Sequence, residues 1–262
     1  MKTLKLDVTA NGVARVVMAR PEVFNAFDEV MISELDDVFA RLSDDEAVRV
    51  VVLSGQGSAF SAGADLQWMK RASEASHEWN LADARAFASM LDRIARCSKP
   101  TIAQVHGVAL GGGVGLVCAC DFAVADDGAK FAVSEVKFGI LPAVIGPYLV
   151  NAVGRREATR LALSAVRVPA IEAFAIGLVH RVVPTGELVG SVDALVAELL
   201  CNAPTAQSEV KRLFSQLAVG PVTPEVRELT AQTISRVRMT DEAREGFAAF
   251  FAKRLPAWSR FR

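Results

Sequence analysis

HGVALGGGVGL, residues 106–116, places five glycines within eleven residues, between an apolar stretch of strand character and one of helical character. The first N–H groups of a helix have no intrahelical acceptor, and the helix dipole adds partial positive charge there. Glycine allows another molecule to approach such N–H groups closely. The stretch therefore predicts a strand, a turn and a helix start, with N–H donors exposed at the turn.

A second stretch, GSAFSAGADLQWM at residues 57–69, repeats this order of strand, glycine-containing turn and helix start. Two such turns that face each other would hold two N–H donors at one point, where an oxygen with developing negative charge fits. Close helix–strand packing and phosphate binding are alternatives for each turn alone. The phosphate-loop pattern G-x-x-x-x-G-K-[ST] is absent, and no acidic residue on a following strand completes a dinucleotide-binding pattern.

The rest of the chain alternates between two apolar periodicities. Apolar residues at helical spacing indicate helices over residues 28–42 and 79–97, among others. Residues with period-two or continuous apolar character indicate strands over 4–9, 13–19, 48–55, 101–107, 121–125 and 129–133. This alternation predicts an α/β fold in which helices cover the sheet. Beyond Pro184 only helical patterns remain, so we expect a core over residues 1–184 and a helical section over residues 185–262.

Composition excludes several classes of function. Lys and Arg total 29 against 30 Asp and Glu, so a nucleic-acid partner or a polybasic membrane patch is not expected. The amino-terminal residues lack the apolar core of a signal peptide, and no apolar stretch reaches the length of a membrane span. These features predict a cytoplasmic protein with a small-molecule or protein partner. The four cysteines at 97, 118, 120 and 201 lack the spacing of a zinc site or a disulfide framework, so reduced cysteines and no metal are expected.

Four segments taken together resemble the enoyl-CoA hydratase/isomerase family over essentially the whole chain. They are RPEVFNAFD (20–28), AFSAGADL (59–66), the glycine stretch, and VSEVKFGILPAVIGPYLV (133–150). The resemblance implies the crotonase fold, a spiral of strand–strand–helix units with a helical carboxyl-terminal section. It also implies that residues 1–184 bind and convert an acyl-CoA thioester, and that residues 185–262 serve oligomerisation as a homotrimer or a hexamer.

The resemblance assigns roles to individual residues. It places two oxyanion N–H donors at Ala64 and Gly112 and a catalytic glutamate at Glu135. Family members often carry lysine where this chain has Glu22 and Gln67, so other residues must meet the phosphate charge of coenzyme A. Coenzyme A is part of the substrate, and no separate cofactor is expected. The residues expected to bind the substrate are Val23, Phe24, Ala62, Leu66, Gly111 and Lys253.

The chemistry of this family fits such a site. Water addition across the C2=C3 bond of an enoyl thioester pushes charge onto the thioester oxygen, and two fixed N–H donors stabilise that enolate more than the starting carbonyl. The attacking water must lose a proton and C2 must gain one, so a carboxylate is needed near both carbons. Glu135 is the candidate for this role.

One position departs from the two-glutamate hydratases that the chain resembles. Their other glutamate lies three residues after the second oxyanion glycine, where this chain has Gly115. Either Glu135 carries both protons of a hydration, or the chain is a Δ3–Δ2-enoyl-CoA isomerase, which needs one carboxylate to move a proton between C2 and C4. A non-catalytic acyl-CoA-binding protein is a third alternative, although it would have no use for Glu135.

The finer resemblance concerns the acyl group. AFSAGADLQWMKRA, SEVKFGILPAVIGPYLV and EGFAAFFAKRLPAW are most similar to bacterial hydratases of leucine and acyclic-terpene degradation, which act on 3-methylglutaconyl-CoA and related branched glutaconyl thioesters. The distal carboxylate of such a substrate should meet a cation. Lys70, Arg71, Lys137 and the carboxyl-terminal basic residues are the candidates.

Several residues near these motifs have ordinary structural explanations. His106 is expected to be a hydrogen-bonded core histidine, and Asp65 falls in a first helical turn, where a carboxylate caps free N–H groups. Asp121 ends a short helix and is expected to cap it or to form an ion pair. Trp68 and Met69 fit either core packing or the wall of an acyl pocket.

Overall fold

A six-stranded sheet with the order β1-β2-β3-β4-β6-β9 forms the centre of the computed structural model, which describes residues 1–259. β1 and β2 are antiparallel, and every following neighbour in this sheet is parallel. The bounds of its strands are β1 Leu4–Val8, β2 Val13–Met18, β3 Val50–Gly55, β4 Thr101–Val105, β6 Phe122–Asp126 and β9 Arg181–Val183.

A second, three-stranded sheet begins where strands β4 and β6 of the first sheet end. It consists of β5 (Val108–Leu110), β7 (Lys130–Ala132) and β8 (Val168–Pro169), with β5 parallel and β8 antiparallel to β7. The chain passes from β4 directly into β5, and from β6 directly into β7. In both places the chain leaves the large sheet and forms a strand of the small sheet. It then continues into a helix or a loop at the edge where the glycine turns lie.

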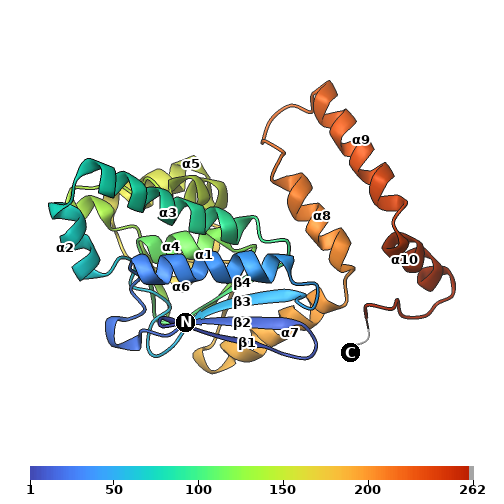
Figure 1. Ribbon diagram of the computed structural model, residues 1–262, viewed down its shortest axis with the longest axis horizontal. Helices are drawn as coiled ribbons and strands as arrows, with labels where there is room; N and C mark the ends of the chain where they lie inside the picture. The colour runs from blue at the N-terminus through green and yellow to red at the C-terminus, as the bar shows by residue number, and fades with distance from the viewer. Residues whose placement is uncertain (260–262) are drawn as a thin grey trace.

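Helices cover both faces of the large sheet (Figure 1). The side chains of β3 alternate, so that Val51 and Leu53 belong to the core beneath α1 and α3, whereas Val50 and Val52 pack with α7. This period-two burial follows from the pleat of a strand. The helices of the two layers are α1 Glu29–Asp44, α2 Leu66–Glu74, α3 His77–Ala95, α4 Gly112–Ala119, α5 Gly146–Ser164, α6 Ala170–Ala175 and α7 Leu188–Leu200.

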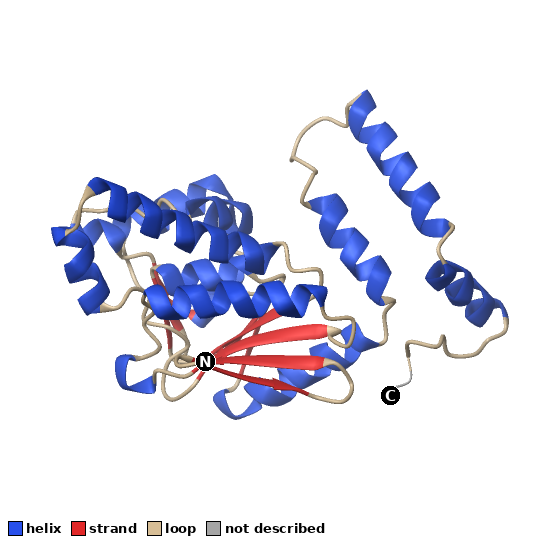
Figure 2. Ribbon diagram, viewed as in Figure 1, coloured by secondary structure: helices blue, strands red, loops and turns tan. Residues whose placement is uncertain are grey.

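The last three helices stand apart from the two layers. Figure 2 shows that the chain beyond α7 contains helices and loops and extends away from the sheet. These helices are α8 Pro204–Phe214, α9 Pro224–Arg238 and α10 Asp241–Phe251. The helix α7 packs on the sheet through Val192 and Val196, so it belongs to the core. The boundary expected after Pro184 therefore lies ahead of the last core helix. The projecting section begins with α8.

The predicted α/β class is confirmed, and most of its long elements lie where the periodicity indicated. Three short strands, β5, β8 and β9, were not predicted, and none exceeds three residues. Such segments are too short to show a period. The fold also contains the short 3-10 helices Pro21–Val23, Glu135–Phe138 and Thr185–Glu187. Among residues 1–259 no single helix has the length and apolarity of a membrane span, although the bent pair 185–200 and 204–214 meets both conditions together.

One ion pair attaches the projecting section to the core. Nζ of Lys211 on α8 lies 2.5 Å from Oδ2 of Asp121, and Asp121 also accepts hydrogen bonds from the backbone N–H and the hydroxyl of Thr101. Both members of the pair are largely shielded from solvent. The prediction that Asp121 forms an ion pair is therefore confirmed, and the pair fixes where α8 leaves the core.

We expect Lys211→Met to lower the free energy of unfolding by about 1–2 kcal/mol, because it leaves a shielded carboxylate without its cation. Arg212→Met is the matched control, since Arg212 is exposed and pairs with Glu209 on its own helix. Exposed pairs contribute little, so the control should shift the free energy by less than about 0.5 kcal/mol. Urea denaturation measures both variants, and equal shifts would contradict the anchoring role of Lys211.

Candidate active site

The two glycine turns and the Glu135 segment line one cavity of about 290 Å³. Its walls come from the loop before α2, from the junction of β5 with α4, from the stretch after β7 and from the residue before β8. The lining residues are Ala62, Ala64, Leu66, Met69, Leu110, Gly111, Gly112, Ala132, Ser134, Glu135, Lys137, Phe138, Ile140 and Arg167. Segments that are distant in the sequence therefore meet at the edge between the two sheets.

The first turn leaves the backbone N–H of Ala64 without an acceptor among the described residues. From residue 60 to residue 65, every N–H except that of Ala64 donates to an acceptor within the described part of the chain. The N–H of Ala62 donates to the carbonyl of Phe24 at 2.9 Å, and that of Asp65 to the carbonyl of Phe27 at 3.0 Å. Burial favours paired N–H groups. An unpaired donor on a cavity wall is therefore available to a ligand.

The second turn leaves a donor at a matching place. Gly111 donates to the carbonyl of Ala132 at 2.8 Å, whereas the N–H of Gly112, the first residue of α4, has no acceptor among residues 1–259. The two turns touch, because a Cβ atom placed on Gly63 would lie 2.5 Å from the carbonyl oxygen of Leu110 and 3.4 Å from the nitrogen of Gly112. Only a glycine at position 63, where φ is +85°, permits this approach.

Glu135 opens the 3-10 helix that faces these turns. Its Oε1 atom lies 3.2 Å from the position that a Cβ on Gly111 would occupy, and its buried Oε2 atom has no hydrogen-bond partner among the described residues. Burial raises the pKa of Glu135, and the backbone N–H groups of Glu135 and Ser134 offset this only in part. Within residues 1–259, no charged neighbour stabilises the ionised form. The carboxyl group is therefore suited to carry a proton.

The position expected for a second carboxylate is closed. A Cβ atom on Gly115 would lie 2.4 Å from Cγ2 of Ile145 and 3.6 Å from Cδ1 of Leu91. Both side chains are buried, so a larger residue at position 115 has no free volume to enter. Glu135 is consequently the only carboxylate among the residues that line the cavity.

Not all of the predicted binding residues reach the cavity. Ala62, Leu66 and Gly111 line it, whereas Val23 ends the 3-10 helix Pro21–Val23 and Phe24 caps that helix, and neither lines the cavity. Phe24 is joined to the wall by the hydrogen bond from Ala62 and is 54% exposed. Lys253 follows α10 in the projecting section and is not among the residues that line the cavity.

Neighbouring polar residues take structural roles. The side chain of Asp65 caps α2 by accepting hydrogen bonds from the N–H groups of residues 67 and 68. Nε2 of His106 is hydrogen-bonded to the carbonyl of Gly57 at 2.9 Å, as expected, but His106 is only partly buried, so the prediction that it is a core residue was wrong. Met69 lines the cavity, while Trp68 packs against Phe27 and stays behind the wall.

Phe138 and Arg167 are lining residues that sequence reasoning missed. Phe138 could have been found from its place in the short helix that Glu135 begins, since residues at positions i and i+3 of a 3-10 helix share a face. Arg167 gave no signal, because only the two-residue strand β8 brings it to the cavity. Of the candidate cations, Lys137 lines the cavity, whereas Arg71 pairs with Glu29. The described residues contain no cluster of three or more His, Cys, Asp or Glu suited to a metal ion.

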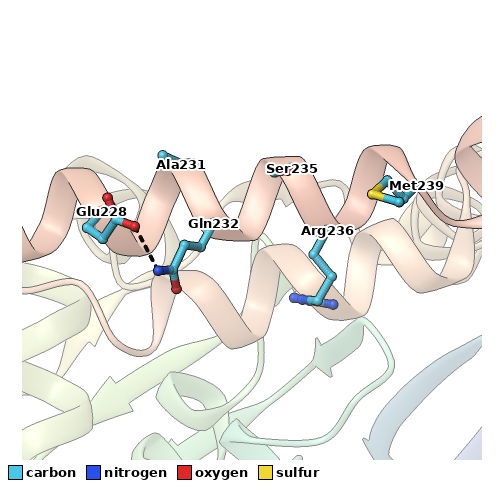
Figure 3. Close-up of a pocket in the computed structure, with 6 residues that line it drawn as sticks. All are labelled: Glu228, Ala231, Gln232, Ser235, Arg236 and Met239. Carbon is cyan, nitrogen blue, oxygen red and sulfur yellow. Dashed lines mark hydrogen bonds between the residues drawn. The ribbon is translucent and has the colours of Figure 1, made fainter.

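A second hollow lies on the projecting section. Figure 3 shows residues along one face of α9, where the side-chain amide of Gln232 donates to Glu228 at 2.7 Å. This hollow, lined by Glu228, Ala231, Gln232, Ser235, Arg236 and Met239, contains none of the residues predicted for catalysis. The residues predicted for catalysis, Ala64, Gly112 and Glu135, line the cavity at Glu135 instead.

Comparisons with known proteins agree with this arrangement. The sequence profile of the family described as enoyl-CoA hydratase/isomerase matches residues 8–260. A putative enoyl-CoA hydratase of Thermus thermophilus is 38% identical over 251 residues, which covers 96% of this chain and 99% of the relative. The carnitinyl-CoA dehydratase of Escherichia coli K12 is 33% identical over 271 residues, with 97% of each chain covered.

Solved structures are similar over the same length. An enoyl-CoA hydratase from Shewanella pealeana superimposes with a TM-score of 0.94 at 39% identity and covers 98% of this chain and 96% of its own. Pseudomonas aeruginosa AtuE gives a TM-score of 0.94 at 35% identity, with coverage of 98% and 100%. The similarity confirms the predicted crotonase-like fold, including its helical carboxyl-terminal section.

We expect Glu135→Gln to raise the free energy of unfolding at neutral pH. Because the pKa of Glu135 is raised in the folded chain, ionisation costs stability as the pH rises above the ordinary value near 4.5. Glutamine removes this cost, so the advantage of the variant should shrink as the pH falls from about 7 toward about 4.5. Urea denaturation across this pH range measures the difference in the free energy of unfolding between the variant and the parent. Glu228→Gln, on the exposed face of α9, is the control. A variant that is less stable at pH 7 would contradict the burial of an ionisable group.

Proposed function

This chain belongs to the enoyl-CoA hydratase/isomerase family, and on that basis we propose that it adds water across the C2=C3 bond of an enoyl-CoA thioester. The observation that carries the proposal is the meeting of two unpaired backbone donors and one buried carboxylate at a single cavity. The family and the relatives named hydratases support it further.

In this proposal Ala64 and Gly112 form the oxyanion site. Their N–H groups bind the thioester oxygen, on which negative charge grows as water attacks C3. The donors lie on turns that are already fixed, so they need no reorganisation during the reaction. Removal of one such donor typically costs on the order of 10²–10³ in rate.

Glu135 performs both proton transfers. It takes a proton from the attacking water and returns one to C2 of the enolate. A general acid–base group works best when its pKa lies near the working pH, and burial moves the pKa of Glu135 in that direction. Since Ile145 closes the volume beside Gly115, no second carboxylate shares the task.

The substrate spans the cavity and its rim. Leu66, Ala62 and Gly111 contact the thioester arm, and the loop of Val23 and Phe24 borders the coenzyme A part. Lys253 meets phosphate charge only if it comes from another subunit, because it lies on the projecting section. We therefore propose that the working protein is a homotrimer or a hexamer. We also propose that it works in the cytoplasm, with the acyl-CoA as its only small-molecule partner and no further cofactor.

The proposed acyl group is a branched glutaconyl chain such as 3-methylglutaconyl, which assigns the chain to leucine degradation or a related pathway. Support comes from the resemblance of the AFSAGADLQWMKRA and SEVKFGILPAVIGPYLV segments. Lys137 and Arg167 add support, since both line the cavity and neither has an ion-pair partner among the described residues. Such cations suit a distal carboxylate.

A specific observation keeps the Δ3–Δ2-enoyl-CoA isomerase as the second candidate. The cavity wall has a single carboxylate, and a proton shuttle between C2 and C4 requires only one. A non-catalytic acyl-CoA-binding protein is disfavoured, because the buried Oε2 atom of Glu135 has no hydrogen-bond partner among the described residues, which costs stability without serving binding.

The test compares three thioesters: 3-methylglutaconyl-CoA, crotonyl-CoA and a 3-enoyl-CoA. The proposal predicts a gain of one water on the first two, with a higher kcat/KM for the glutaconyl substrate. Glu135→Gln should lower the rate by about 10²–10⁴-fold while the protein still binds the thioester. Loss of absorbance of the conjugated thioester and product mass follow the reaction.

Other outcomes separate the alternatives. Conversion of the 3-enoyl thioester alone, without a change in mass, would make the chain an isomerase. Binding of all three thioesters without conversion would make it a non-catalytic binder. Equal kcat/KM values for the glutaconyl and crotonyl substrates would refute the proposed acyl specificity but not the hydration.

A further inference from the structure

Arg20 joins the two loops that meet beneath the first oxyanion turn. One guanidinium nitrogen, Nη1, donates to the carbonyl of Ala26 at 2.7 Å and lies 3.2 Å from Oδ2 of Asp28. The other, Nη2, donates to Oδ2 of Asp65 at 2.9 Å. The side chains of Arg20, Asp28 and Asp65 are 18%, 19% and 10% exposed. One guanidinium therefore ties three acceptors together in a shielded place.

Both carboxylates in this cluster also cap helices. Asp28 accepts hydrogen bonds from the N–H groups of residues 30 and 31 at the start of α1. Asp65 uses Oδ1 to cap α2, which leaves Oδ2 for Arg20. A side chain that links two capping carboxylates fixes the start of one helix relative to the start of the other. Arg20 thus sets the spacing between the amino-terminal ends of α1 and α2.

The backbone between these caps contains Ala64. The N–H of Phe27 donates to the carbonyl of Gly63 at 2.8 Å, and the N–H of Asp65 donates to the carbonyl of Phe27 at 3.0 Å. Ala64 is held between these two bonds, and its own N–H is left for a ligand. Any shift of residues 63–65 relative to residues 26–28 must break the contacts of Arg20 as well.

We propose that Arg20 is a positioning residue, which holds the Ala64 N–H in place for the thioester oxygen by clamping Asp65 to the loop of residues 26–28. The proposal rests on the function proposed above, in which Ala64 is an oxyanion donor. Arg20 does not line the cavity, so it acts on the reaction only through this clamp. A displaced donor loses much of its effect, since a misplacement of about 1 Å can cost about 10²-fold in rate.

The geometry calls for arginine. Its planar fork presents several fixed donors, and here two nitrogens reach three oxygens on different segments. A lysine carries the same charge at one point and reaches fewer of these acceptors at once. Arg20→Lys should therefore retain part of the function, and Arg20→Gln, which has no charge, should retain less.

The experiment measures kcat and KM for hydration by Arg20→Gln and Arg20→Lys. Arg160→Gln is the matched control, because Arg160 also bridges two carboxylates, Glu157 and Glu172, away from the cavity. We expect kcat of Arg20→Gln to fall by about 10–100-fold with little change in KM, an intermediate value for Arg20→Lys, and an unchanged kcat for the control. Assays run well below the thermal midpoint of each variant.

A double-mutant cycle with Asp65→Asn tests the route of the effect. Asparagine keeps an oxygen that can cap α2 but removes the charge that Arg20 binds. If Arg20 acts through Asp65, the double variant should be about as slow as the slower single variant. Additive losses in kcat would overturn the proposed route.

Backbone amide exchange gives a readout that does not need activity. Arg20→Gln should take up deuterium faster than the parent within residues 60–69, and Arg160→Gln should not. If Arg20→Gln fails to fold, Arg20→Lys takes its place in both assays. Unchanged kcat with a lowered thermal midpoint, or unchanged exchange in residues 60–69, would overturn the proposal. An inactive parent would instead refute the proposed function, while faster exchange in the variant would still demonstrate the clamp.

Discussion

The contact between the two glycine-containing turns is the constraint on which the site depends. Gly63 lies so close to Leu110 and Gly112 that a methyl group at position 63 would overlap the backbone of the other turn. This contact places the start of α2 beside the start of α4, with the N–H groups of Ala64 and Gly112 unpaired among the described residues. The sheets, whose parallel strands end at this edge, serve to bring the turns together (Figure 1).

The same edge determines what the site can do. Glu135 rests against Gly111 and faces a cavity without another carboxylate, while Ile145 fills the volume beside Gly115. Water addition and double-bond migration both proceed through an enolate that two N–H donors stabilise and one carboxyl group protonates. In hydration the enolate forms when water attacks C3, and it is then protonated at C2. In Δ3–Δ2 isomerisation the carboxylate forms the enolate by taking a proton from C2, and the proton is returned at C4.

The sequence predicted the parts of this arrangement that rest on local signals. Strand–turn–helix order and glycine content indicated both turns, and the chain's likeness to a known family indicated Glu135. Long-range packing determined the rest. Arg167 reaches the cavity through a two-residue strand, and Ile145 meets Gly115 only because α5 begins beside α4. The apolar faces of α7 gave no sign that this helix would join the core and that α8 would begin the projecting section.

In the proposed function, the N–H groups of Ala64 and Gly112 and the carboxyl group of Glu135 form and protonate an enolate at C2 of an acyl thioester. Incubation with butyryl-CoA in D2O tests this claim most directly, because a saturated thioester can exchange its C2 protons but can neither gain water nor move a double bond. We expect deuterium at C2 with the parent protein and almost none with Glu135→Gln. Absence of exchange with the parent, or equal exchange with both proteins, would contradict it.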